Sequence, residues 1–283
     1  MMTPQPVPIM GTDPNLTGYP MAMNYMNYGA NYGPQNFIYI QDPLTELGQS
    51  SGAIIRQQVE LLEAITGCES QNRYHVFLES PMGLKYAFKC SERSGSCVRC
   101  CLAPSCRPLE MIIRHVVSLD QLNNDFAKIF INVNKPCMCT CCCLCRPVME
   151  VHLADNQEYL GKIREPCTCC DYDLEIYDAA GYLKYNIIGD CCQVGFCCGG
   201  MAKKLASIRF DIKENNSTVG NITKLSSNVG EFFTKADSYH VSFPQNATPK
   251  EKMLLIIAGL MLDYQYFESE DESSQHPHGH HYY

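Results

Sequence analysis

The chain has 283 residues, of which 46% are hydrophobic and 18% are charged, with 19 cysteines and no tryptophan. The length allows one large domain or two small ones, and a net charge of -8 excludes a global basic field that would attract nucleic acid. No GxSxG, P-loop or HExxH motif occurs, so we expect neither an enzyme nor a nucleic-acid partner.

Residues 1–42 form an arm rich in Pro, Met, Asn, Tyr and Gly, with too little aliphatic content to bury. We expect it to be disordered and to offer contacts to protein partners or to further copies of the chain. The first basic residue is Arg56, so the arm lacks the positive start of a signal peptide, and we expect a cytosolic origin.

The segment 54–65 has apolar residues at helical spacing and is followed by Thr66 and Gly67. This pattern predicts a short amphipathic helix packed on the domain. It is the short N-terminal helix of the predicted fold.

From Arg73 onward the apolar residues alternate with polar ones, and turn residues recur at short intervals. The predicted strands are 74–78, 84–88, 109–117, 126–133, 148–153, 160–163, 174–177, 183–188, 205–212, 219–222 and 239–243. About a dozen evenly spaced strands indicate a mainly β sandwich or barrel, and a closed barrel can enclose a central helix.

An internal repeat supports two related halves. Leu84-Lys85-Tyr86 recurs as Leu183-Lys184-Tyr185, each time after a hairpin turn. Two half-barrels of related sequence would each leave an apolar face to be covered.

The longest apolar run is ten residues long and has no polar face. It consists of Met253, Leu254, Leu255, Ile256, Ile257, Ala258, Gly259, Leu260, Met261 and Leu262. Such a helix is either buried in protein or inserted in a membrane, and a bilayer core needs about 20 apolar residues. Its length and the Asp263 that follows favour a helix buried inside the barrel over a membrane span.

The cysteines are the strongest compositional feature, and many of them are adjacent in sequence. In a cytosolic chain they point to metal, redox chemistry or lipidation rather than to disulfides. Several pairs, such as Cys139/Cys142 and Cys167/Cys170, have the C-x-x-C spacing of structural zinc sites. Residues 269–283 are acidic and rich in histidine, which predicts a disordered tail and leaves 43–268 as the folded domain.

These pieces together resemble the phospholipid scramblases, whose fold is a tubby-like β-barrel. The matching segments are 57–67, 72–74, 83–88, 107–109, 141–145, 241–244 and 252–268. The resemblance implies a closed barrel around the C-terminal helix and calcium-promoted, ATP-independent, bidirectional movement of phospholipids between leaflets. It also implies a palmitoylated lipid transporter on the cytosolic face of the plasma membrane.

The resemblance places the palmitoylation cluster at Cys141, Cys142, Cys143 and Cys145. One acyl chain binds a membrane marginally whereas two or more anchor it stably, so a cluster makes physical sense. A metal site and thiols without a role are the alternatives.

The resemblance also places a calcium loop at residues 235–246, with Asp237, Ser238, Tyr239 and Asn246 as its oxygen-bearing positions. The loop is degenerate, because Lys235 stands at the first position and only one carboxylate remains. We expect weak or absent Ca²⁺ binding and, from the alternation through Phe243, a strand.

Two functions remain open. The first is a phospholipid scramblase; the second is a peripheral module that binds lipid or protein without moving lipid.

Overall fold

The computed structural model describes residues 42–58, 71–94, 106–117, 127–138, 145–168, 172–190, 193, 207–225 and 238–267. All of them belong to the unit Ile40–Tyr283.

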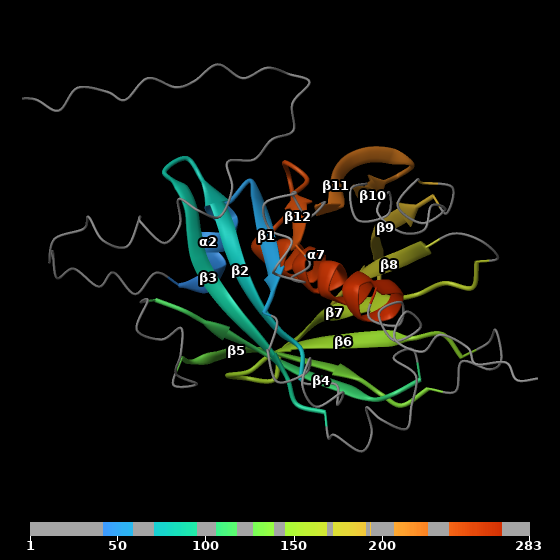
Figure 1. The fold of residues 1–283 in the computed structure, drawn as a ribbon, viewed down its shortest axis with the longest axis horizontal. Helices are drawn as coiled ribbons and strands as arrows, with labels where there is room; N and C mark the ends of the chain where they lie inside the picture. Colours follow the sequence, from blue (N-terminus) through green and yellow to red (C-terminus); the bar gives the residue numbers. More distant parts are fainter. Residues whose placement is uncertain are drawn as a thin grey trace, which may run out of the picture. The chain divides into compact units, whose positions relative to one another are not determined.

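Twelve strands in this part of the chain form one closed antiparallel barrel (Figure 1). They are β1 (Gly52–Gln57), β2 (Arg73–Ser80), β3 (Gly83–Glu92), β4 (Leu109–His115), β5 (Ile129–Lys135), β6 (Val148–Leu153), β7 (Tyr159–Arg164), β8 (Tyr172–Asp178), β9 (Leu183–Gly189), β10 (Ile208–Glu214), β11 (Ser217–Leu225) and β12 (Ser238–Ser242). Each strand pairs with its sequence neighbours, and β1 closes the ring by pairing with β12. Closure leaves no free sheet edge.

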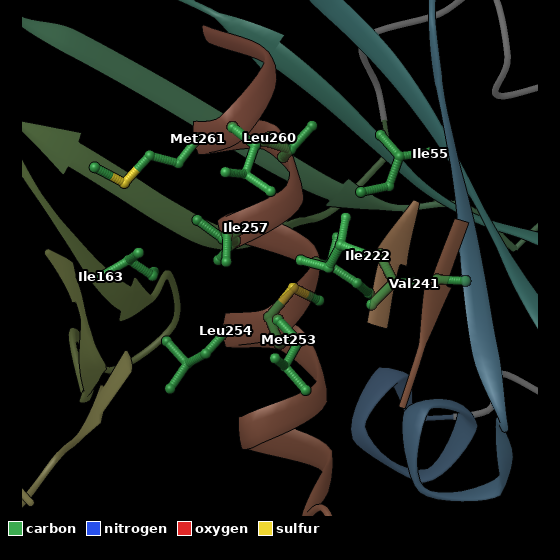
Figure 2. Close-up of a cluster of buried hydrophobic side chains, with 14 of the residues drawn as sticks. Ile55, Ile163, Ile222, Val241, Met253, Leu254, Ile257, Leu260 and Met261 are labelled. Atoms are coloured by element: carbon green, nitrogen blue, oxygen red, sulfur yellow. The ribbon is translucent and has the colours of Figure 1, made fainter. Parts of the chain in front are cut away.

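The helix α7 (Pro249–Leu262) lies inside this barrel, as Figure 2 shows. Thr248 and Glu251 form a capping box and Pro249 follows the cap, which fixes where the helix begins. Every residue from Glu251 to Leu262 is buried. The apolar run is therefore a core helix, as its length predicted.

Strands from different parts of the ring pack against α7. Four fully buried side chains lie around the helix in Figure 2: Ile55 of β1, Ile163 of β7, Ile222 of β11 and Val241 of β12. Gly259 allows the closest approach, because a Cβ at this position would lie 2.8 Å from Cδ1 of Ile55. The helix fills the space that the strands enclose.

The predicted helix at 54–65 is wrong for its first residues, because Gly52–Gln57 forms β1. Ala53 and Ile55 point inward and are fully buried, whereas Ile54 is half-buried, which is the period of a strand. Pairing with β2 and β12 satisfies the backbone on both sides of this segment, and that pairing outweighs the helical spacing. Residues 59–65 lie outside the described residues.

The short N-terminal helix lies earlier in the chain, at α2 (Pro43–Gln49), where Asp42 caps it and accepts a hydrogen bond from Thr45. The end of α2 is fixed by Lys252 of α7. Its Nζ donates to the carbonyl oxygens of Leu47, Gly48 and Ser50 at 3.0, 3.0 and 2.7 Å. Burial lowers the pKa of the Lys252 ammonium.

The internal repeat has a structural counterpart. Lys85 and Lys184 lie near the starts of β3 and β9, which are six strands apart in the ring and so face each other across it. Lys85 pairs with Glu46 of α2 at 2.6 Å, and Lys184 pairs with Glu251 of α7 at 3.1 Å. Each repeated lysine thus ties one helix to the same end of the barrel.

The two ends of the barrel differ in their connections. One end, called here the hairpin end, carries the turns after β2, β8 and β10 and the start of α7. At the other, the cysteine end, connections 58–72, 93–108, 136–147, 165–171, 190–207 and 226–237 join successive strands. Helix α7 runs from the hairpin end to the cysteine end.

Candidate functional site

In the sequence, all cysteines except Cys90 fall between strands whose facing ends lie at the cysteine end. In an antiparallel meander every second connection lies at the same end, so segments far apart in sequence begin and end there. Four of these cysteines are among the described residues: Cys106, Cys137, Cys145 and Cys167. We call these four the cysteine rim.

Cys106 and Cys137 lie on neighbouring connections that are hydrogen-bonded to each other. The backbone N–H of Met138 donates to the carbonyl oxygen of Cys106 at 3.0 Å. One residue further in, the buried Nζ of Lys135 donates to the carbonyl oxygen of Arg107 at 2.6 Å. This part of the rim is therefore held by the ends of β4 and β5.

Cys145 and Cys167 are held in a similar way by the ends of β6 and β7. The Arg146 guanidinium pairs with the carboxylate of Glu165, and the backbone N–H of Glu165 donates to the carbonyl oxygen of Pro147 at 3.0 Å. Because β5 also pairs with β6, the four rim cysteines lie on consecutive strand ends.

The rim thiols differ in chemistry from the one cysteine inside a strand. Cys137, Cys145 and Cys167 are exposed and not in disulfides. Cys90 is fully buried, and burial raises the pKa of its thiol, which keeps it protonated and unreactive. Among the described cysteines, the thiols of Cys137, Cys145 and Cys167 are the exposed ones that a reactant can reach from solvent.

A buried polar cluster lies below the rim, where α7 ends. Asp263 accepts hydrogen bonds from the hydroxyls of Tyr74 and Tyr239 at 2.6 and 2.5 Å. Arg107 donates through Nε to the hydroxyl of Tyr264, and its guanidinium lies 4.9 Å from the centre of that ring. The Asp263 carboxylate, which we expected to oppose membrane insertion, is therefore hydrogen-bonded inside the barrel. Asp263 is also the first residue of the π-helix η4 (Asp263–Phe267), which follows α7.

Of the predicted palmitoylation residues, Cys145 is exposed at the start of the segment that leads into β6. Cys141, Cys142 and Cys143 lie outside the described residues. Palmitoylation stays a prediction.

The predicted calcium residues do not converge in the described part of the chain. The predicted strand at 239–243 is confirmed as β12. Ser238 begins that strand, Tyr239 points into the barrel, and Asn246 is exposed in a turn beyond the other end of the strand. Asp237 lies outside the described residues, and calcium binding stays a prediction.

The described residues contain no group of three or more His, Cys, Asp or Glu side chains placed to hold a metal ion. No helix among them combines the length and the apolar character that a membrane crossing requires.

The grouping of the cysteines at one end was missed in the sequence, although the signal was present. Cysteines occur only in alternate connections between the predicted strands, and a meander brings alternate connections together. The polar cluster around Asp263 left no such signal, because its members are separated by up to 189 residues.

The chain is similar to proteins of one family. A family model described as Scramblase matches residues 34–269, which include the whole described barrel. The chain is 28% identical to human phospholipid scramblase 1 over 86% of this chain and 71% of the human protein. It is 28% identical to bovine phospholipid scramblase 2, over 80% of this chain and 71% of the bovine protein, and 26% identical to human phospholipid scramblase family member 5, over 80% and 77%.

No solved structure matches the chain. The Scramblase model nevertheless covers the barrel from α2 through η4, so the similarity extends over every element described above. The chain belongs to the scramblase family.

Proposed function

We propose that this protein moves phospholipids in both directions between the leaflets of the plasma membrane, without ATP and from the cytosolic face. The observation that carries the proposal is the Scramblase match across the whole barrel, with relatives named phospholipid scramblases. A chain that transports lipid in this way is not an enzyme in the usual sense.

The membrane anchor in this proposal is the palmitoylation cluster at Cys141, Cys142, Cys143 and Cys145. Cys145 is exposed at the cysteine end, where a thiolate has access to an acyl donor. Two or more acyl chains on one short segment anchor a protein stably, whereas a single chain does not.

The barrel supports a particular mode of transport. A headgroup must cross about 30 Å of hydrocarbon, and α7 offers it no polar path because its side chains are packed inside the barrel. We therefore propose that the anchored barrel, alone or as an oligomer, disturbs the packing of the bilayer locally and lowers the barrier for headgroups.

Calcium enters this proposal as a weak promoter only. The segment offers one carboxylate, Asp237, and its neighbour Tyr239 is committed to a hydrogen bond with Asp263. Ca²⁺ sites require six to eight oxygen ligands. We expect any calcium dependence to survive Asp237→Ala.

The burial of α7 favours a second candidate, a peripheral lipid- or protein-binding module without transport activity. Such a module would have the same acyl anchor but would not move lipid. One assay distinguishes the two candidates.

The test uses vesicles with fluorescent phospholipid in both leaflets and dithionite added outside, without ATP and with or without Ca²⁺. Scrambling by the acylated full chain makes the inner-leaflet fluorescence accessible, so the signal falls well below the half that protein-free vesicles retain. Binding to the vesicles with the half retained supports the module and overturns the transport proposal.

A further inference from the structure

The cysteine end carries reactive thiols beyond the predicted cluster. We propose that this whole end of the barrel lies on the bilayer, with Cys137 and Cys167 S-acylated beside Cys145. The inference rests on the proposed lipid anchor, but it does not require that lipid be moved.

The arrangement of the rim is the first reason. Cys137 follows β5, Cys145 precedes β6 and Cys167 follows β7, and these three strands are consecutive neighbours in the ring. All three thiols are exposed, and none forms a disulfide. The segments that carry Cys145 and Cys167 are joined by the Arg146–Glu165 pair and the Glu165–Pro147 hydrogen bond. Chains attached here would leave from one continuous surface.

The distribution of arginine is the second reason. Among the described residues, every arginine except Arg114 lies in the half of the barrel nearer the cysteine end: Arg56, Arg73, Arg93, Arg107, Arg146, Arg164 and Arg209. The exposed cations of the hairpin end are lysines, such as Lys85 and Lys128. A guanidinium forms two parallel hydrogen bonds to a phosphate, which a lysine cannot do.

Several of these arginines remain accessible to a headgroup. The side chain of Arg164 is 45% exposed although it pairs with Glu175 at 2.9 Å, and Arg93 is exposed beside the end of β3. Arg146 is 28% exposed while it pairs with Glu165. Phosphate groups of anionic phospholipids fit such donors.

Acylation at several strand ends would fix an orientation as well as a location. One myristoyl-length chain gives only marginal binding, and a second signal makes the anchor stable. Chains from three neighbouring strand ends cannot all insert unless that end faces the bilayer. The end of α7 would then point to the membrane, and the hairpin end would point away.

The competing arrangement is the reverse. The hairpin end carries exposed apolar side chains at two turns, Met82 at 94% and Tyr182 at 71% exposure. These tips could enter a bilayer instead of the rim, and the two arrangements place opposite ends of the barrel in lipid.

The covalent step needs a fatty acyl-CoA as the acyl donor. The thiolate sulfur of Cys137 or Cys167 attacks the thioester carbonyl carbon, a new carbon–sulfur bond forms, and the bond to the coenzyme A sulfur breaks. Coenzyme A leaves as a thiolate and takes up the proton that the cysteine lost. No oxidation or reduction occurs.

The first experiment counts acylated cysteines by exchanging thioester-bound chains for a polyethylene-glycol label that shifts the protein on a gel. Full-length protein in which Cys141, Cys142, Cys143 and Cys145 are all serine is produced in cells that contain acyltransferases. We expect two polyethylene-glycol labels per chain to remain, seen as two shifts on the gel. Cys137→Ser should remove one of these labels and Cys167→Ser the other. Cys90→Ser, the buried control, should change nothing.

Absence of any residual label in the variant without the predicted cluster would overturn the proposal. A residual label that neither Cys137→Ser nor Cys167→Ser lowers would do the same. Circular dichroism of each variant establishes that the barrel is folded.

The second experiment measures orientation, and the absence of tryptophan from the chain makes it clean. One tryptophan is introduced at an exposed position of each end, as Pro136→Trp or Met82→Trp, in acylated protein bound to vesicles of anionic phospholipid with brominated chains. Bromine should quench the P136W fluorescence several-fold and leave that of M82W unchanged. Stronger quenching of M82W would show that the hairpin tips insert and would overturn the proposal.

Neither readout depends on transport. Suppose that the dithionite assay shows no scrambling, while two labelled cysteines remain and bromine quenches the P136W fluorescence. This result would overturn the proposed function and leave the inference standing. Scrambling with no residual label would overturn the inference alone.

Discussion

Asp263 shows how a single carboxylate is accommodated in an apolar core. It accepts two tyrosine hydroxyls, from Tyr74 on β2 and Tyr239 on β12, and so connects the end of α7 to two strands. A buried charge with no partner is strongly destabilising, whereas one with several hydrogen bonds is tolerated. The tyrosines are therefore part of what keeps α7 in place.

We expect Tyr74→Phe and Tyr239→Phe each to lower the free energy of unfolding by about 1.5–3 kcal/mol, the usual contribution of a hydrogen bond to a charged group. Urea denaturation measures the loss. Tyr182→Phe is the control, because that side chain is 71% exposed, and it should change stability by less than about 0.5 kcal/mol. In an Asp263→Asn background the tyrosine substitutions should cost less, and equal costs in both backgrounds would contradict this role.

Glu46 makes the attachment of α2 sensitive to acid. Burial by itself would raise the pKa of its carboxyl, but the His115 ring, 3.4 Å away, and the Lys85 ammonium outweigh burial and lower that pKa below the ordinary 4.5. Because the folded-state pKa is the lower one, the stability from this carboxylate is present above pH 4.5 and is lost as pH falls through the folded-state value.

We expect Glu46→Gln to lower stability near neutral pH and to flatten the decline of the urea midpoint as the pH falls below 4.5. Midpoints measured across this range test it. Asp155→Asn removes a carboxylate that is 67% exposed and pairs with Lys128 on the surface, so it should leave the pH profile as it is. An unchanged slope in Glu46→Gln would contradict the assignment.

At the scale of the element, α7 is the core of the barrel. Its side chains are buried on every face, and strands on both sides of the ring contact it (Figure 2). A helix in this position stabilises the strands by covering their inner faces. The helix α7 could insert into a membrane only if the barrel opened.

Leu255 tests this position because it is 0% exposed. Leu255→Ala should cost about 2–5 kcal/mol through the cavity that it leaves. Leu255→Asp places an unpaired charge in the core and should abolish the cooperative unfolding transition. Leu183→Asp, at a position that is 47% exposed, is the control and should stay folded. A folded Leu255→Asp protein released from membranes would instead identify α7 as a membrane segment.

For the whole molecule, closure of the ring depends on one short strand. β1 is the only link between β2 and β12 in the described barrel. Without it both of those strands would expose an unpaired edge, and such edges promote aggregation. The packing of Ile55 on α7 would be lost with it.

We expect a chain that begins at residue 40 to fold like the full-length protein, because the described barrel begins at α2. A chain that begins at residue 59 should lose α2 and β1 and aggregate. Size-exclusion chromatography and circular dichroism distinguish the two. A monomeric, folded product of the shorter chain would show that β1 is dispensable.

The strand-rich class was predictable because alternation along a strand is local, and the predicted strands overlap all described strands except β1. That strand was read as a helix because Ile54 and Ile55 are adjacent and satisfy either period. Partners that decide between the two, Phe77 and His240 opposite Ile54, are distant in sequence. The candidate site divides in the same way, since Cys145 was taken from the family resemblance and Cys137 lies just upstream in sequence, whereas Cys167 was placed beside them only by the pairing of β6 with β7.

The sequence by itself determined the approximate number of strands, the length and apolar character of the central helix, and the positions of the cysteines. Each of these features depends only on residues that are adjacent or close together in the chain. Only the tertiary structure decided that β1 closes the ring, that α7 is enclosed with Asp263 paired, and that thiols from separate connections share one end. These outcomes depend on contacts between residues far apart in the chain, and no local pattern encodes which strand ends meet.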